Sequence, residues 1–404
     1  MLIKPRMRGF ICTTAHPVGS AALMRQAVDR LADVRLSRAP RRVLVIGGSS
    51  GYGLATRLVT AFAGGAATIG VSHERPPTDD RTASAGWYNN RSFEVLARGR
   101  GLVAATLEGD AFSDEVKAQT VDLIVRDFGQ VDLLVYSLAA PSRRDPRTGL
   151  THYSSILPLR PCSDLKALDV DTGAITVASL PAATQVQLDD TVAVMGGGDW
   201  SRWVETLAAH DLLSPGCRTL HYTYVGSPPT APIYADGTIG RAKADTALAA
   251  RRMNDVLGEG FARLVALKAI VTQASSAIPL MPLYWSLLAP VMTRLGLQEG
   301  ALEQILRLFE QVIPGGEVDG EGRLRLDDRE LRDDVQAEVA RRWSLVTTES
   351  LAQYADWPGF RAEQLRLFGF DAPGVDYARE VDPRWTLQAA EPVPSAPALW
   401  PSPG

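Results

Sequence analysis

Cysteine is scarce in this sequence of 404 residues, and the three that occur, Cys12, Cys162 and Cys217, lie far apart. They form no C-x-x-C pair, which argues against a disulfide framework and a cysteine-ligated zinc site. We therefore expect a reducing, cytoplasmic setting and no bound metal. Histidine is also rare, and four of the five lack ligand spacing and are interpreted as structural or exposed: His16, His152, His210 and His221.

A strong excess of either charge is missing as well. The 42 Lys and Arg residues and the 46 Asp and Glu residues leave a net charge of −4. This balance provides no bulk attraction to nucleic acid or to an anionic membrane, so we expect neither as a partner. An acidic acyl-carrier partner would need only a few basic side chains near the mouth of a site. With 46% apolar and 22% charged residues, the composition is that of a globular protein.

Long apolar runs are few. The stretch Gly9–Cys12 is too short for the core of a signal peptide. Residues 269–293 lack charge over a length that could cross a bilayer, but Pro279, Pro282 and Pro290 interrupt them. We therefore expect no stable membrane insertion. The run predicts a buried strand, a loop and then an apolar wall, which is either part of an acyl-chain pocket or simply core.

The chain is organised around the apolar run Val43–Ile46, which ends in a glycine cluster that includes Gly47, Gly51 and Gly53. This pattern predicts a buried parallel strand, a tight turn and a helix. Such a turn lets the backbone approach a pyrophosphate at the helix N-terminus. Its G-x-x-x-G-x-G spacing resembles the turn of short-chain dehydrogenases/reductases rather than the commoner G-x-G-x-x-G. Glu74 follows a second apolar run, where an acid binds ribose hydroxyls.

Apolar runs alternate with helical periodicity along most of the chain. This alternation predicts an α/β fold, a Rossmann-like doubly wound parallel sheet related to short-chain dehydrogenases/reductases. Ser113 is a predicted N-cap, and the following helix has an apolar face of Val116, Val121, Ile124 and Val125. The predicted strands are 43–46, 67–71, 101–107, 131–140, 218–225 and 263–271, with a hairpin at 151–159. The predicted helices follow Gly53 and Ser92 and cover 114–127, 185–194, 200–209, 239–257, 301–311 and 328–343.

We predict a single large domain over residues 1–404. Its dinucleotide-binding core covers 41–275 and contains an insertion at about 141–216, which no flexible linker brackets. A mainly helical region at 276–385 is expected to cover one end of the sheet. The Pro-, Ala- and Ser-rich tail 387–404 is expected to be loose. The size of the core suggests that a monomer suffices.

Tyr234 and Lys243 are the candidate catalytic pair. Tyr234 falls just before a predicted helix and Lys243 about one turn inside it, and a fold-back at Asp236–Gly237 could bring both into one cleft. A phenol with a pKa of about 10 is a weak acid, and a neighbouring ammonium lowers that pKa by favouring the phenolate. Lys243 could therefore hold the nicotinamide ribose and tune Tyr234. A buried tyrosine and a solvated lysine without function remain the alternative.

Eight stretches carry distinctive motifs in order along the chain: RGFICTTAHP at 8–17, GGSSGYG at 47–53, AGWYN at 85–89, GDAFSD at 109–114, YSLA at 136–139, MGG with DW at 195–200, YVG at 224–226 and TQASSAIP at 272–279. From about Leu2 to about residue 380, the sequence closely resembles the NADH-dependent trans-2-enoyl-CoA reductase family. Bacterial members of that family include enoyl-acyl-carrier-protein reductases of the FabV type. The family's hallmark is Tyr-x8-Lys, longer than the Tyr-x3-Lys of typical short-chain reductases, and Tyr234 and Lys243 fit it.

The resemblance implies a role for each matching residue. Tyr234 would be the proton donor, Lys243 would bind the cofactor and Tyr224 would contact the thioester substrate. The pyrophosphate would lie on Gly47, Gly48, Ser49, Ser50, Gly51 and Tyr52, the adenosine ribose on His73 and Glu74, the adenine on Asp110 and Ala111, and the nicotinamide side on Leu138, Ala139, Ile270, Val271 and Thr272.

The implied reaction is the NADH-dependent reduction of the C2=C3 double bond of trans-2-enoyl thioesters in fatty-acid synthesis. Hydride would pass from the nicotinamide to C3, and a donor at the thioester oxygen would stabilise the enolate before C2 is protonated. Tyr234 would supply that donor. The substrate would be an enoyl-CoA or an enoyl-acyl-carrier protein, and the sequence leaves both the carrier and the chain length open.

Two positions depart from the family pattern. The segment Ser72–Arg75 stands where the family commonly has two aromatic residues before the acid, and Ala244 stands where many relatives have a second lysine. Glu74 would repel a 2′-phosphate and favour NADH, which Arg75 would partly offset if it turned inward. Two alternatives to enoyl reduction remain: a short-chain carbonyl reductase, which the Tyr-x8-Lys spacing disfavours, and a non-catalytic NADH-binding redox sensor.

Overall fold

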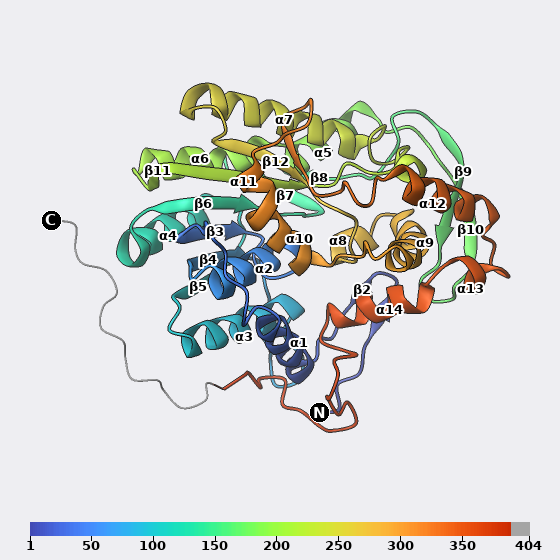
Figure 1. The fold of residues 1–404 in the computed structure, drawn as a ribbon, viewed down its shortest axis with the longest axis horizontal. Helices are drawn as coiled ribbons and strands as arrows, with labels where there is room; N and C mark the ends of the chain where they lie inside the picture. The colour runs from blue at the N-terminus through green and yellow to red at the C-terminus, as the bar shows by residue number, and fades with distance from the viewer. Residues whose placement is uncertain (389–404) are drawn as a thin grey trace.

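The computed structural model describes residues 1–388. Its centre is a seven-stranded parallel sheet in the order β13-β12-β11-β6-β3-β4-β5 (Figure 1). This confirms the predicted α/β fold. The strand order reverses between β3 and β6, which is the switch point where ligands bind in open sheets of this kind. The strands are β3 (Arg42–Ile46), β4 (Ala67–Ser72), β5 (Ala104–Glu108), β6 (Val131–Tyr136), β11 (Leu213–Thr223), β12 (Ala262–Ala266) and β13 (Arg323–Arg325).

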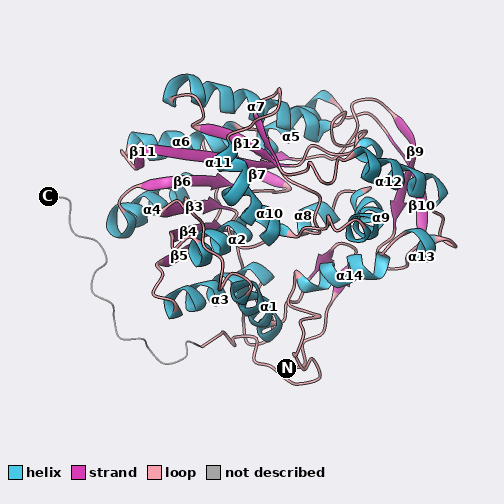
Figure 2. Ribbon diagram, viewed as in Figure 1, coloured by secondary structure: helices cyan, strands magenta, loops and turns pink. Residues whose placement is uncertain are grey.

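Strand β3 is apolar from Val43 to Ile46 because these four residues are buried on both faces of the sheet. Leu44 lies opposite Ile69 of β4 and Leu134 of β6 in the parallel register. Val43 and Val45 pack into the core on one face of the sheet, and Leu44 and Ile46 pack into the core on the other. The neighbouring strands and the helices beside the sheet supply the rest of both cores. Figure 2 shows these helices around the sheet. On the first face they are α1 (Pro17–Asp29), α2 (Gly51–Leu58), α3 (Ala85–Gly99) and α10 (Ala301–Arg307), and on the second α4 (Asp114–Leu123), α6 (Gly198–Ala209) and α7 (Thr238–Leu257).

Helix α4 begins as predicted, since the Ser113 hydroxyl accepts a hydrogen bond from the Val116 N–H at 3.1 Å. The helix then widens into a π-helical turn over Ile124–Phe128. Most of the predicted apolar face is buried, but Val125 is 63% exposed. The prediction for Val125 was wrong because it assumed one regular α-helix up to residue 127.

Two further predictions of local structure were wrong. Helix α3 begins at Ala85 rather than near Ser92, so the AGWYN segment is its first turn. Residues 151–159 do not form a hairpin by themselves, because β8 (Thr151–Tyr153) pairs backwards with β7 (Ser142–Arg144). The intervening turn is closed by a hydrogen bond from the Asp145 N–H to the Leu150 carbonyl at 2.8 Å. A second ribbon pairs β9 (Cys162–Leu168) with β10 (Ile175–Leu180), and α5 (Gln185–Met195) follows it.

The uncharged run 269–293 contains α8 (Gln273–Ser276) and nearly all of α9 (Met281–Arg294). The buried strand predicted at its start was wrong, because β12 already ends at Ala266. Helix α9 is apolar nearly all round because the rest of the C-terminal region packs against it. Helices α12 (Asp333–Leu345), α13 (Leu351–Tyr354) and α14 (Trp357–Arg366) lie in the same part of the molecule (Figure 1). Among residues 1–388, no helix combines the length and apolarity that a membrane span requires. The tail predicted to be loose lies outside the described residues from 389 onward, and Leu387 is buried.

Candidate active site

The predicted cofactor residues gather at one edge of the sheet. The turn 47–52 follows β3, and His73 and Glu74 follow β4. Asp110 and Ala111 follow β5, and the segment 138–139 follows β6. Because the strands are parallel, their carboxyl ends meet along the same edge, beside the switch point. The structure therefore brings these residues to the place where a dinucleotide binds in folds of this type.

The glycine turn is built so tightly that side chains are excluded. Gly47 has φ +84°, and a Cβ there would lie 2.3 Å from the Ser137 carbonyl oxygen. A Cβ on Gly53 would lie 2.0 Å from the carbonyl oxygen of Gly47. These clashes explain the glycines, because only a bare backbone allows α2 to start directly above β3. The N-terminus of α2 is thus left open to an anion, as a pyrophosphate site requires.

Glu74 faces this turn. Its carboxylate accepts hydrogen bonds from the Ser49 hydroxyl at 2.6 Å and from the Ser84 hydroxyl. Asn89 donates to the Ser49 carbonyl oxygen at 3.0 Å, so α3 holds the turn from the other side. An ionised carboxylate has further acceptor capacity, which suits ribose hydroxyls. Arg75 is exposed and pairs with no acid in the part of the chain that the structure describes.

The turn also meets the segment after β12. The Tyr52 hydroxyl donates to the Lys268 carbonyl oxygen at 2.6 Å. A Cβ on Gly51 would lie in van der Waals contact with the Thr272 methyl group, at 3.4 Å. Thr272 in turn caps α8, accepting a hydrogen bond from the Ser275 N–H at 2.9 Å. The turn predicted to bind the pyrophosphate therefore adjoins the segment that is predicted to line the nicotinamide side.

Tyr234 lies in the turn before α7, where the sequence predicted it. Its ring stands edge-on to that of Tyr224, with the centroids 4.9 Å apart and the planes at 88°. Tyr234 is 7% exposed, and its hydroxyl has no hydrogen-bond partner within residues 1–388. Lys243 lies in the second turn of α7, and burial without a counter-charge lowers its pKa to about 8.

The expected effect of Lys243 on Tyr234 is not seen. Burial raises the pKa of Tyr234 above its usual value, and the negative charge of Glu330 raises it further. No hydrogen bond joins the tyrosine to the lysine in the described part of the chain. The prediction of a lowered phenol pKa was wrong because the depth at which the phenol is buried cannot be read from the sequence.

Sequence reasoning missed two supports of the site. A buried ion pair joins Lys117 Nζ and Asp199 Oδ1 at 2.8 Å, and Lys117 also donates to the Ala111 carbonyl oxygen at 2.7 Å. The DW motif at 199–200 was a signal for Asp199, although it gave no partner. The other support is Glu330, which accepts a hydrogen bond from the Tyr224 hydroxyl at 2.8 Å. Nothing marked Glu330, since it lies in a charged run typical of a solvated turn.

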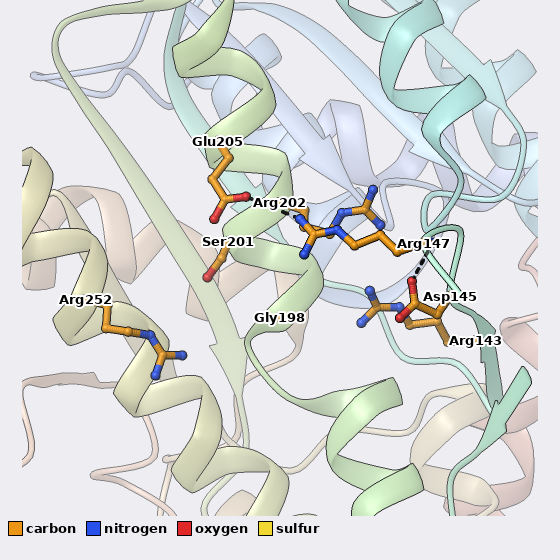
Figure 3. A pocket seen from close by; sticks show the side chains of 8 residues that line it. All are labelled: Arg143, Asp145, Arg147, Gly198, Ser201, Arg202, Glu205 and Arg252. Atoms are coloured by element: carbon orange, nitrogen blue, oxygen red, sulfur yellow. Dashed lines mark hydrogen bonds and ion pairs between the residues drawn. The ribbon is translucent and has the colours of Figure 1, made fainter. Parts of the chain in front are cut away.

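A polar hollow of about 270 Å³ opens elsewhere, between the β7 end, α6 and α7 (Figure 3). Four arginines line it, but two have acidic partners: Arg147 pairs with Glu205 at 3.9 Å, and Arg202 pairs with Asp114. Arg143 donates to the Ala193 carbonyl oxygen at 2.8 Å. The hollow contains none of the predicted site residues, and two of its four arginines are neutralised by acids.

Three family models match successive parts of the chain. The NAD(P)H binding domain of trans-2-enoyl-CoA reductase matches residues 2–79, and the trans-2-enoyl-CoA reductase catalytic region matches 81–313. A third model, described as an enoyl reductase FAD binding domain, matches 318–381.

Curated relatives and solved structures resemble nearly the whole chain. The enoyl-acyl-carrier-protein reductase (NADH) of Burkholderia thailandensis is 49% identical over 388 residues, covering 95% of this chain and 98% of that protein. The enzyme of the same name from Aliivibrio salmonicida is 46% identical over 399 residues, covering 97% and 100%. The structure of Clostridium acetobutulicum trans-2-enoyl-CoA reductase in complex with NADH has a TM-score of 0.91 and 40% identity, covering 95% and 98%. The Treponema denticola enzyme in complex with NAD gives the same values.

The descriptions of the family models imply a nicotinamide dinucleotide and a flavin dinucleotide, and the residues present suit only the first. The open glycine turn and Glu74 suit a nicotinamide dinucleotide. Within residues 318–381, the strand-to-helix turn between β13 and α12 contains no glycine, so it lacks the glycine-rich pyrophosphate turn of a Rossmann-type dinucleotide site. Helix α12 also begins with Asp333 and Asp334, whose charges would repel a pyrophosphate at its N-terminus. We therefore derive no step through a flavin.

Proposed function

Because the chain belongs to the trans-2-enoyl-CoA reductase family, we infer that it is an oxidoreductase that reduces the C2=C3 double bond of trans-2-enoyl thioesters with NADH. The observation that carries this inference is the Tyr234 hydroxyl, which has no partner among the described residues and lies at the sheet edge that holds the glycine turn. When bound, NADH supplies the hydride that adds to C3.

We propose that the residues at this edge bind the cofactor as the motifs imply. The backbone of the turn 47–52 would hold the pyrophosphate, and Glu74 with His73 the adenosine ribose. Asp110 and Ala111 would hold the adenine. Leu138, Ala139 and the segment 270–272 would line the nicotinamide side, and the Lys243 ammonium would donate to ribose hydroxyls. The negative charge of Glu74 would oppose a 2′-phosphate and so favour NADH over NADPH.

Tyr234 acts as the donor to the thioester oxygen. Negative charge develops on that oxygen as C3 is reduced, and a hydrogen-bond donor that is already in place stabilises it. The raised pKa of Tyr234 keeps the phenol protonated through the neutral range, so its hydrogen is available. Tyr224 packs beside it and would contact the thioester. The buried Tyr234 ring and the partly buried Tyr224 ring would limit the access of water to the place where the enolate forms.

We further propose that the carrier is either CoA or an acyl-carrier protein, and that the products serve fatty-acid synthesis. A monomer would suffice, because the sheet edge is completed by residues of one chain. The cytoplasm is the compartment that suits the three free cysteines.

The test is the loss of NADH absorbance when the purified protein meets crotonyl-CoA, with NADPH and a ketone substrate in parallel. Tyr234→Phe is expected to lower kcat by about 10²–10³-fold while leaving NADH binding intact, because one preorganised donor is lost. Tyr153→Phe is the matched control, since that tyrosine is 64% exposed on β8. Turnover of the ketone instead would support a carbonyl reductase. Tight NADH binding without oxidation by any enoyl thioester would support a redox sensor.

A further inference from the structure

Glu330 is a fully buried acid in the turn between β13 and α12, with 0% of its surface exposed. Burying a carboxylate is unfavourable unless opposite charge or hydrogen bonds compensate for the lost water. Glu330 forms no ion pair within residues 1–388, so its compensation comes from direct hydrogen bonds and from the more distant charge of the buried Lys268. The residues that donate hydrogen bonds to Glu330 therefore indicate its role in the protein.

Three donors converge on this carboxylate. Oε1 accepts from the Tyr224 hydroxyl at 2.8 Å and from the Tyr284 hydroxyl at 2.7 Å, and Oε2 accepts from the Ala269 N–H at 2.7 Å. Three donors on two oxygens is the arrangement of an ionised carboxylate, which only accepts. Burial raises the pKa of Glu330, while the charge of the buried Lys268 opposes that shift.

These bonds join parts of the chain that are distant in sequence. Tyr224 follows β11, Ala269 follows β12 and Tyr284 lies on α9. Gln336 of α12 secures the assembly, donating to the Tyr284 hydroxyl at 3.1 Å and to the Glu330 carbonyl oxygen at 2.7 Å. Helix α12 packs against α9 in the C-terminal region (Figure 1). Through Glu330, this region reaches the edge of the sheet where the reaction is proposed to occur.

The consequence for Tyr224 follows from its single hydroxyl hydrogen. That hydrogen is donated to Glu330, so Tyr224 has none to offer a thioester oxygen. Its ring is instead held edge-on against the ring of Tyr234. The Tyr234 hydroxyl, which has no partner in the described part of the chain, is then the one phenol of the pair with a hydrogen for the substrate.

We propose that Glu330 is a positioning residue, whose buried carboxylate anchors the Tyr224 hydroxyl and thereby holds Tyr224 as a fixed wall that aims Tyr234 at the thioester oxygen. The proposal rests on the function inferred above. It also gives the C-terminal region a part in enoyl reduction that needs no flavin.

Removal of the acceptor tests the proposal. Glu330→Leu keeps a similar volume but leaves the Tyr224 hydroxyl without its partner, free to rotate or to compete for the thioester oxygen. We expect kcat with crotonyl-CoA to fall by about 10- to 100-fold, because small displacements of positioned groups have effects of this size. The affinity for NADH, measured by fluorescence, should stay within about twofold. Glu330→Gln, which retains one acceptor oxygen, should recover most of kcat.

The decisive comparison is made in two backgrounds. Glu330→Leu is measured both in the wild-type protein and in the Tyr224→Phe variant. If Glu330 acts through Tyr224, Glu330→Leu lowers kcat in the wild-type protein but lowers it little further in the Tyr224→Phe variant. Should the leucine variant fail to fold, Glu330→Asp withdraws the carboxylate by one methylene and is measured in the same two backgrounds. Asp356→Ala removes the N-cap of α14 and serves as a control for simple destabilisation of the C-terminal region. It should lower the melting temperature without lowering kcat.

Two results would overturn the proposal. One is a folded Glu330 variant with wild-type kcat. The other is an equal fold-decrease in kcat in the wild-type and Tyr224→Phe proteins, which would mean that Glu330 acts independently of Tyr224. A wild-type protein that oxidises no NADH with enoyl thioesters would remove the proposed function itself, and the two failures are therefore distinguishable.

Discussion

At the scale of single residues, burial decides the protonation states of the candidate catalytic groups. Tyr234 holds its proton more firmly than an exposed phenol because burial raises its pKa, whereas Lys243 holds its proton less firmly because burial lowers its pKa to about 8. The two shifts have the same cause, since a low-dielectric environment disfavours the charged form of either group. They act in opposite directions because one group is charged when deprotonated and the other when protonated.

The lowered pKa of Lys243 predicts a pH-dependent affinity for NADH. As the pH rises through about 8, the ammonium loses its proton and with it the charge-assisted hydrogen bonds to the cofactor. We expect the dissociation constant for NADH to increase several-fold between pH 7 and pH 9.5, measured by NADH fluorescence. Lys243→Arg keeps its charge over this range and should give a flatter profile. Parallel profiles for the two proteins would contradict the assignment of the ammonium to cofactor binding.

At the scale of secondary-structure elements, the glycine turn is the joint on which the cofactor site depends. Helix α2 starts immediately after β3 because Gly53 allows its backbone to touch that of Gly47. The approach exposes the helix N-terminus to the edge of the sheet. Strand and helix propensity do not account for this close approach. It is possible because Gly47 and Gly53 have no side chains.

Gly53→Ala is therefore expected to damage both stability and cofactor binding. The new Cβ would lie 2.0 Å from a backbone oxygen, so α2 must shift away from the turn. We predict a lower melting temperature and at least a tenfold weaker affinity for NADH, measured by thermal denaturation and fluorescence titration.

Gly99→Ala provides the matched control for this substitution. Gly99 ends α3, and a Cβ there would meet nothing within 4 Å. Alanine is favoured over glycine in helices by about 0.5–1 kcal/mol, so this variant should be as stable as the wild type or slightly more stable. Equal decreases in melting temperature and in affinity for NADH for Gly53→Ala and Gly99→Ala would show that the contact at Gly53 is unimportant.

At the scale of the whole molecule, the C-terminal region completes the site. It adds β13 to the sheet, packs α12 and α14 against α9, and supplies the Glu330 carboxylate that accepts the Tyr224 hydroxyl hydrogen. Helix α12 of this region begins with two acids, whose charges would repel a flavin pyrophosphate at that N-terminus. The region is therefore interpreted as a support for the substrate side of the site.

This interpretation predicts that the protein works without a flavin. The purified protein should show no flavin absorbance, should release none on denaturation, and should oxidise NADH with crotonyl-CoA at the same rate with or without added FAD. Absorbance spectra before and after denaturation measure this, with a known flavoprotein treated in parallel. A stoichiometric flavin that persists through purification would contradict it.

Much of the fold could be predicted from the sequence because its signals are local. The run Val43–Ile46, the glycines behind it and the cap at Ser113 each depend on neighbours within a few residues. The pairing of β7 with β8 could not be predicted, because the register depends on how the turn after Asp145 closes. Val125 was misplaced because a π-helical turn changes which residues face the core.

By itself, the sequence determined the parallel α/β sheet, the glycine turn and the family, since hydrophobic periodicity and motif spacing are written along the chain. Only the tertiary structure decided the direction in which the pKa of Tyr234 is shifted and the buried position of the Glu330 carboxylate. Both depend on burial and on partners more than 90 residues away, such as the one that Glu330 finds in Tyr224. A charged side chain in a charged segment is normally solvated, and only the packing of the folded chain determines that Glu330 is buried.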